Sequence, residues 1–211
     1  FFCASFIFVR TITANLIINS VVAAVSSMSK TALLLLAEGA EELELITIAD
    51  ILARSKVNVV IAGVSGKDVV LCGLGVKIQP DVSLADVQDN EFDAVILPGG
   101  VQGTDNLSKS PIVGKLLQRQ HGANKIVAAM CAAPCALKAH KIAFGYKITS
   151  YPSMKDQLAG DYEYQDSEIV VVDRNVVTSQ GPATASEFAF KLAEILVDKK
   201  TVASVRKGML F

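Results

Sequence analysis

The residue whose type and setting most directly indicate chemistry is Cys131. It follows an apolar run over residues 125–130 that predicts a buried strand, and it precedes a helical segment over residues 132–140. A thiol at a strand-to-helix turn is exposed above the sheet, where the following N–H groups bind an anion and the helix dipole favours a thiolate. The alternative is that Cys131 is a small buried residue, as many free cysteines are. Position alone leaves the two interpretations open.

Glu44 is the second candidate. It lies between two leucines in the segment 41–55, whose apolar residues recur mostly at helical spacing. A carboxyl group that faced inward beside a thiol would have a raised pKa and could donate or shuttle a proton. The alternative is an exposed helix charge, which spacing alone favours. Glu41 and Glu42 stand at the start of the same helix, and we expect them to be solvated capping residues.

The other polar candidates give weaker signals. Gly99 and Gly100 follow an apolar run and would let a ligand approach the backbone, although Pro-Gly-Gly is also an ordinary turn. His121 and His140 follow helices, so we read both as surface residues and expect no Cys-His pair. The four cysteines have neither the spacing of a zinc site nor that of a secreted disulfide scaffold, and we predict no metal: Cys3, Cys72, Cys131 and Cys135.

These residues must be positioned by alternating strands and helices. Apolar runs predict core strands over residues 31–37, 57–63, 92–97 and 125–130, short strands over 69–72 and 76–78, and a late β pair over 169–172 and 176–179. Helical patterns cover residues 41–55, 112–120, 132–140 and about 181–197. This order predicts a doubly wound α/β domain, in which ligands bind at the carboxyl ends of the strands. The segments 38–44, 98–100 and 131–134 would meet there.

Composition excludes several classes of protein. The chain has 211 residues, of which 51% are hydrophobic and 19% charged, so it can bury a core and is not intrinsically disordered. Its 20 Lys and Arg against 21 Asp and Glu give a net charge of -1, which offers no basic footprint for nucleic acid and no polybasic membrane patch.

Residues 1–29 differ from the rest, because they contain no acid and one basic residue, Arg10. Their longest apolar run, 21–25, is too short to span a membrane, so we expect no stable membrane insertion. Three interpretations compete: a mitochondrial presequence, a secretory signal, or sequence upstream of the true start, since Met28 follows. We favour the third and predict an extension over 1–29 and one domain over 30–211.

Five segments occur together in one order: 36–44 (Leu-Ala-Glu-Gly-Ala-Glu-Glu-Leu-Glu), 95–100 (Val-Ile-Leu-Pro-Gly-Gly), 128–134 (Ala-Ala-Met-Cys-Ala-Ala-Pro), 149–152 (Thr-Ser-Tyr-Pro) and 178–182 (Thr-Ser-Gln-Gly-Pro). In this combination the chain resembles the DJ-one family, the Parkinsonism-associated deglycases of the PfpI-like superfamily, from residue 29 to about residue 210. The resemblance implies a flavodoxin-like α/β sandwich with a mostly parallel sheet, and a homodimer.

The resemblance also implies roles for individual residues. The reactive thiol falls on Cys131, its acid partner on Glu44, and the oxyanion-binding backbone on Gly99, Gly100 and Ala132. Cys131 and Cys72 would be the thiols modified by oxidation, Cys131 to a sulfinate.

The function implied is protection against oxidative stress, with glutathione-independent glyoxalase or deglycase activity on 2-oxoaldehydes and glycated adducts and with no cofactor. The alternative is a non-enzymatic redox sensor or chaperone. A cysteine peptidase ranks last, because no histidine is credible beside Cys131. A cytoplasmic protein with mitochondrial and nuclear pools is the expected location.

Four positions depart from the family pattern. Tyr151 stands where the family often has His, and Gln180 and Leu74 stand where it commonly has Arg. Loss of two cations near the site predicts weaker binding of an anionic sulfinate. Gln79 replaces a second peripheral cysteine.

Overall fold

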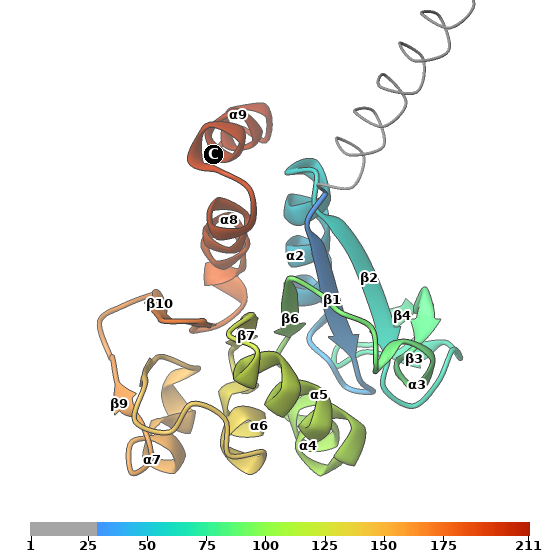
Figure 1. Cartoon of the computed structure of the whole chain (residues 1–211), viewed down its shortest axis with the longest axis vertical. Helices are drawn as coiled ribbons and strands as arrows, with labels where there is room; N and C mark the ends of the chain where they lie inside the picture. Colours follow the sequence, from blue (N-terminus) through green and yellow to red (C-terminus); the bar gives the residue numbers. More distant parts are fainter. Residues whose placement is uncertain (1–28) are drawn as a thin grey trace, which may run out of the picture.

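The computed structural model describes residues 29–211 (Figure 1). Its centre is a seven-stranded sheet in the order β10-β11-β7-β6-β1-β2-β5. Neighbouring strands are parallel except β10 and β11, which are antiparallel. The strands are β1 (Thr31–Leu36), β2 (Asn58–Gly63), β5 (Val82–Ser83), β6 (Ala94–Leu97), β7 (Ile126–Met130), β10 (Val170–Asp173) and β11 (Val176–Ser179). The predicted α/β fold with a mostly parallel sheet is confirmed.

Helices cover both faces of this sheet, which explains why β1 reads as an unbroken apolar run. Leu34 and Leu36 pack into one core cluster and Leu33 and Leu35 into another, because successive side chains of a strand point to opposite faces. The first cluster lies under α2 (Glu42–Arg54), α8 (Ala185–Leu196) and α9 (Lys199–Gly208). The second lies under α3 (Leu84–Val87), α4 (Val101–Lys109), α5 (Pro111–Gly122) and α6 (Pro134–Ala139).

Short elements complete the domain. An antiparallel hairpin of β3 (Val70–Leu71) and β4 (Lys77–Ile78) follows β2 along the chain, and β8 (Lys147–Ile148) pairs in parallel with β9 (Glu163–Tyr164). The remaining turns of helix are η1 (Pro152–Met154), α7 (Lys155–Leu158) and η2 (Pro182–Thr184).

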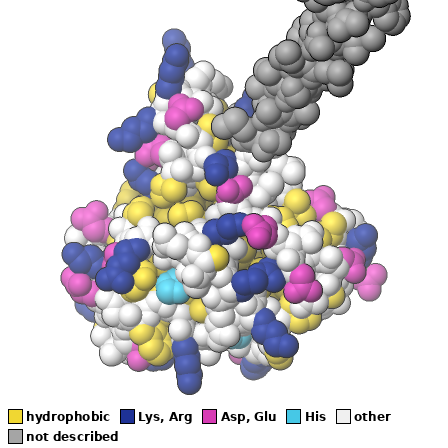
Figure 2. Space-filling model, in the orientation of Figure 1, with side chains coloured by type: hydrophobic (Ala, Val, Ile, Leu, Met, Phe, Trp, Pro, Cys, Tyr) yellow, Lys and Arg dark blue, Asp and Glu magenta, His cyan; other side chains and the backbone are white. Residues whose placement is uncertain are grey.

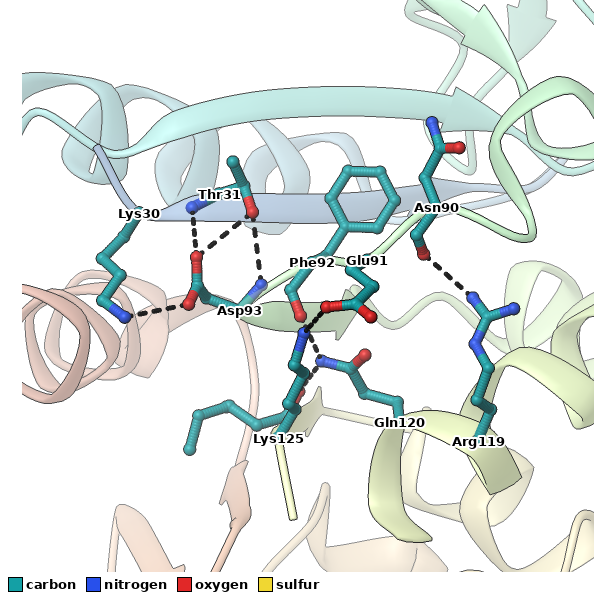
Figure 3. A network of polar contacts seen from close by, with 10 residues as sticks. Lys30, Thr31, Asn90, Glu91, Phe92, Asp93, Arg119, Gln120 and Lys125 are labelled. Atoms are coloured by element: carbon teal, nitrogen blue, oxygen red, sulfur yellow. Dashed lines mark hydrogen bonds and ion pairs between the residues drawn. The ribbon is translucent and has the colours of Figure 1, made fainter. Parts of the chain in front are cut away.

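A polar network fixes the amino-terminal ends of β1 and β6 (Figure 3). The Asp93 carboxylate accepts the N–H of Thr31 at 2.9 Å and pairs with Lys30 at 2.9 Å, while the Thr31 hydroxyl accepts the N–H of Asp93 at 3.2 Å. These bonds hold the two strands in register. Their opposite, carboxyl ends therefore present residues 37–44 and 98–100 at the same edge.

The surface agrees with the balanced composition. Figure 2 shows Lys and Arg side chains interspersed with Asp and Glu over the face in view. Among residues 29–211, no helix is both long and apolar enough to cross a bilayer. The interpretations of residues 1–28 concern a segment outside the described residues. The prediction that both histidines are surface residues is wrong: His121 and His140 are half-buried, and His140 Nε2 lies 2.9 Å from the carbonyl oxygen of Leu107.

Candidate functional site

Three segments meet at the carboxyl edge of the sheet, where β1, β6 and β7 are neighbours. A Cβ atom placed on Gly99 would lie 2.4 Å from Cys131 Cβ, 2.9 Å from Cys131 Sγ and 2.8 Å from Glu44 Oε2. The side chains of Cys131, which follows β7, and of Glu44, in α2, therefore both lie against Gly99, which follows β6. Only a residue without a side chain fits between the thiol and the carboxylate.

Cys131 occupies a strained turn between β7 and α6. Its φ is +59°, a conformation that costs a non-glycine residue on the order of 1–3 kcal/mol. Its N–H donates to the Ser179 carbonyl at 3.0 Å, and its own carbonyl accepts the N–H of Tyr151 at 2.8 Å. These two bonds hold the turn in place. The residue is 9% exposed, so the thiol is nearly buried rather than exposed above the sheet as the turn predicts.

Glu44 faces inward from the first turn of α2 and has no exposed surface. Its Oε2 accepts the N–H of Gly99 at 2.7 Å, while Oε1 has no hydrogen-bond partner in the described part of the chain. The Glu41 side chain caps the helix by accepting the N–H of Glu44 at 2.8 Å. The cap thus fixes the position of Glu44, and the unpartnered oxygen remains available to a ligand.

Burial controls the protonation of this pair. It raises the pKa of Glu44 to about 7, against opposing hydrogen bonds from Gly99 and the Cys131 thiol. Burial, followed by the charge of Glu44, raises the pKa of Cys131 to about 12. At neutral pH the thiol is therefore protonated, and Glu44 is present both as the carboxylate, to which the thiol donates, and as the carboxylic acid. Burial favours the neutral thiol more strongly than the helix dipole favours the thiolate.

Two of the three predicted oxyanion groups point at the sulfur. The backbone N–H groups of Gly100 and Ala132 hydrogen-bond Cys131 and act to lower its pKa. The N–H of Gly99 is already used by Glu44, so Gly99 positions the acid. The Gly100 conformation has a φ of +88°, and a Cβ there would lie 2.3 Å from the Gly39 carbonyl oxygen.

Tyr151, Gln180 and Leu74 bring no formal charge to the positions where the family pattern has a basic residue. Tyr151 lies beside Gly181, whose Cβ would sit 3.2 Å from the tyrosine ring. The Gln180 amide donates to the carbonyls of Asp166 and Glu168 at 3.2 and 3.3 Å. Leu74 is 84% exposed. Within residues 29–211, no Lys or Arg contributes to the pKa shift of Cys131.

Glu42 is not the solvated capping residue that its position predicts. It is 8% exposed, and its Oε1 accepts the N–H groups of Leu74 at 3.0 Å and Val76 at 3.3 Å, which ties the β3–β4 hairpin to α2. Sequence reasoning missed this role because the partners lie more than thirty residues away. Cys72, in the same region, is 4% exposed, and burial with the charges of Glu42 and Glu41 raises its pKa.

No group of three or more His, Cys, Asp or Glu side chains among the described residues could hold a metal ion. The site itself offers a buried thiol and a carboxyl group that titrates near neutrality, flanked by two N–H donors.

Several known proteins are similar to this chain over most of its length. The chain is 49% identical over 183 residues to Protein dj-1beta of Drosophila melanogaster, which covers 87% of this chain and 98% of that protein. It is 41% identical to the glutathione-independent glyoxalase DJR-1.2 of Caenorhabditis elegans, over 85% of this chain and 96% of that protein.

The crystal structure of Drosophila melanogaster DJ-1beta superposes with a TM-score of 0.86 at 49% identity, covering 87% of this chain and 98% of that chain. Residues 30–195 match the description of the DJ-1/PfpI family. The chain is a member of the DJ-1/PfpI family.

Proposed function

We propose that this protein converts small 2-oxoaldehydes such as methylglyoxal, and glycated adducts of them, into hydroxy acids without glutathione. Cys131 is the nucleophile and Glu44 the general acid and base. The observation that carries the proposal is the burial of Glu44 beside Cys131, which brings the pKa of the carboxyl group to about 7. A group with that pKa both accepts and donates protons at neutral pH. A relative at 41% identity is named as a glutathione-independent glyoxalase.

The first step is addition of sulfur to the aldehyde. The Glu44 carboxylate takes the thiol proton as the sulfur attacks the aldehyde carbon, and the C=O electron pair moves to oxygen. The N–H groups of Gly100 and Ala132, which hydrogen-bond the sulfur at rest, stabilise that developing oxyanion. Glu44 then returns the proton to the oxygen, which gives a hemithioacetal.

The second step is an internal oxidation and reduction. Glu44 removes the proton from the former aldehyde carbon, which gives an enediolate, and delivers it to the neighbouring ketone carbon. The hydroxyl proton of the first carbon passes to the former ketone oxygen, so the first carbon is oxidised to a thioester and the second is reduced to an alcohol. Water hydrolyses the resulting thioester, releasing the hydroxy acid and the free thiol. No external oxidant or cofactor enters the balance.

The test is lactate formation from methylglyoxal by the purified protein, Cys131→Ser and Glu44→Gln. We expect each variant to lose at least about 100-fold in kcat/KM, the scale of an acid-base or nucleophilic group. Unchanged turnover in both variants would refute the proposal.

A second candidate function is oxidation sensing at the same thiol. Glu44 Oε1 lacks a partner among residues 29–211, and a protonated Glu44 is positioned to donate from it to an oxygen on Cys131. Cys131 would pass from thiol to sulfinate in two peroxide-dependent steps. Intact mass after mild peroxide, with peptide mapping, tests this. Oxygen on Cys72 or Cys135 and none on Cys131 would contradict it.

We also propose that the chain forms a homodimer. Apolar side chains remain exposed on α2 and the β3–β4 hairpin, and Glu42 joins these two elements. A cluster of this kind is more typical of an interface than of a monomer surface. Its members are between 48% and 84% exposed: Leu43, Ile46, Leu71, Leu74 and Val76.

A further inference from the structure

A groove of about 330 Å³ lies between α4 and α6. One wall is a single face of α4, because Val101, Thr104, Asp105 and Ser108 are spaced three and four residues apart. The opposite wall consists of Ala132, Cys135, Met154 and Gln157, so it is partly apolar. Nothing in the proposed reaction of a three-carbon aldehyde uses this wall of α4.

The groove adjoins residues next to the reaction centre, although Cys131 itself does not line it. The two N–H groups that hydrogen-bond the Cys131 sulfur belong to Gly100 and Ala132. Ala132 lines the groove itself, and Gly100 immediately precedes Val101, the first residue of α4 to line it. A substrate whose aldehyde carbon lay at the sulfur would therefore extend its remaining atoms along α4.

A buried hydroxyl in the groove wall lacks a partner. Thr104 is 6% exposed, and its Oγ1 makes no hydrogen bond within the described chain. The Thr104 backbone N–H donates to the Gly100 carbonyl at 2.8 Å, so only the side-chain hydroxyl lacks a partner among the described residues. Buried polar atoms without a hydrogen-bond partner are rare in native proteins. A bound group that supplies the missing partner is one explanation for such an atom.

The neighbouring groups are also ones that hydroxyls bind. The Ser108 hydroxyl donates to the Thr104 carbonyl at 2.7 Å and keeps its lone pairs free to accept. The Asp105 carboxylate pairs with Lys109 at the surface. Gln157 contributes an amide. The one formal charge on these walls is negative, which disfavours an anionic ligand such as a sugar phosphate.

We propose that this groove binds the polyhydroxylated chain of sugar-derived 2-oxoaldehydes, with the aldehyde carbon at Cys131. The inference rests on the proposed function and extends its substrate class beyond methylglyoxal, whose three carbons and two oxygens leave the groove empty. The groove takes no part in the chemistry. As for methylglyoxal, one water is consumed, the aldehyde carbon becomes a carboxylate and the ketone carbon becomes a secondary alcohol.

The test compares kcat/KM for 3-deoxyhexosulose, a six-carbon 2-oxoaldehyde, with kcat/KM for methylglyoxal. In Thr104→Val, which keeps the shape and loses the hydroxyl, we expect the ratio of the two to fall about fivefold, the effect of one neutral hydrogen bond. Thr201→Val, on α9, is the matched control and leaves the ratio unchanged. If Thr104→Val does not fold, Ser108→Ala is the second groove variant, with the same expected direction. An unchanged ratio in the groove variant overturns the proposal.

A binding measurement separates this proposal from the proposed function. The unreactive 3-deoxyhexitol is added to Cys131→Ser, and backbone amide signals are followed by NMR. We expect shifts confined to α4 and the 131–134 turn, and their loss in Cys131→Ser/Thr104→Val. If neither aldehyde is turned over but these shifts occur, the groove proposal stands and the glyoxalase proposal fails. Absence of shifts in α4 overturns the groove proposal, whatever the turnover.

Discussion

At the scale of single residues, the site depends on one proton held between Cys131 and Glu44. Burial raises the pKa of both groups, and the charge of Glu44 raises that of Cys131 further. The pair therefore rests with a protonated thiol beside a carboxyl group that titrates near neutrality, and it becomes reactive when the thiol proton moves to the carboxylate. The resemblance predicted which two residues meet, and a raised pKa was expected for an inward-facing Glu44. The protonated state of Cys131 was not expected, because it depends on the buried surroundings.

The pH dependence of turnover follows from this pair. Glu44 must be ionised to accept the thiol proton, and its pKa is about 7. We expect kcat/KM for methylglyoxal to rise with pH, with a midpoint near that value, and to level off above it. A pH–rate profile measures this. The profile of Glu44→Gln lacks the inflection, and a wild-type rate that fell through neutrality would argue against Glu44 as the base.

Stability should depend on pH through the same carboxyl. The pKa of the Glu44 carboxyl is about 7 in the folded protein and 4.5 for an ordinary glutamate in water, so the folded state keeps a proton that the unfolded chain releases. Stability therefore falls as pH rises from 4.5 through 7, by up to about 3 kcal/mol at about 1.36 kcal/mol per pKa unit. Urea unfolding at pH 5 and pH 8 measures the difference. Glu44→Gln should lose less stability than the wild type, and equal losses would contradict the account.

At the scale of elements, the turns after β6 and β7 decide the geometry. Gly99 sits where any side chain would lie within 3 Å of both Cys131 and Glu44. The same edge carries Gly100, which begins α4, and the Ala132 N–H before α6. Parallel strands explain why these turns share one edge, and this convergence was predictable from the order of the apolar runs.

Gly99→Ala should disrupt the site more than it disrupts the fold. Its new Cβ would lie 2.4 Å from Cys131 Cβ, so the thiol and the carboxylate must move apart. We expect activity to fall at least about 100-fold and stability to fall by about 1–3 kcal/mol. Lactate formation and thermal unfolding measure the two effects. Gly122→Ala is the control, since a Cβ there meets no atom within 4 Å; equal activity in the two variants would sink the geometric argument.

Other elements escaped sequence reasoning for physical reasons. α4 (Val101–Lys109) has only one buried large apolar residue, Leu107, so it shows no apolar stripe. α9 buries only Val202 and is otherwise rich in charge. β5, β8 and β9 are each two residues long, which is too short to show the alternation of apolar and polar residues that predicts a strand. The role of Glu42 depends on the distant β3–β4 hairpin, and spacing carries no information on such a contact.

At the scale of the whole molecule, a seven-stranded sheet between two helical layers carries the proposed reaction site at its carboxyl edge and also an exposed apolar cluster. The apolar cluster on α2 and the β3–β4 hairpin is anchored by Glu42, which lies two residues before Glu44. A dimer built on this cluster would place its interface close to the reaction site.

Leu74→Glu should dissociate the proposed dimer. Leu74 is 84% exposed, and a buried charge without a partner costs several kcal/mol at an interface. Sedimentation velocity should show the wild type as a dimer and the variant as a monomer at micromolar concentration. Leu210→Glu is the matched control, because Leu210 is 94% exposed at the end of the chain. A dimeric Leu74→Glu would place the interface elsewhere.

The central claim is that Glu44 moves protons for a covalent adduct on Cys131. Its most direct test is native mass spectrometry of Glu44→Gln incubated with methylglyoxal, without a reductant, followed by peptide mapping. Loss of the Glu44 charge removes one cause of the raised pKa of the thiol, so addition to the aldehyde continues more slowly without the base, while the proton transfer between carbons is lost. The account predicts a trapped adduct on Cys131, no lactate, and no adduct at that position in Cys131→Ser. Wild-type lactate formation by Glu44→Gln, or an adduct only on Cys72 or Cys135, would contradict it.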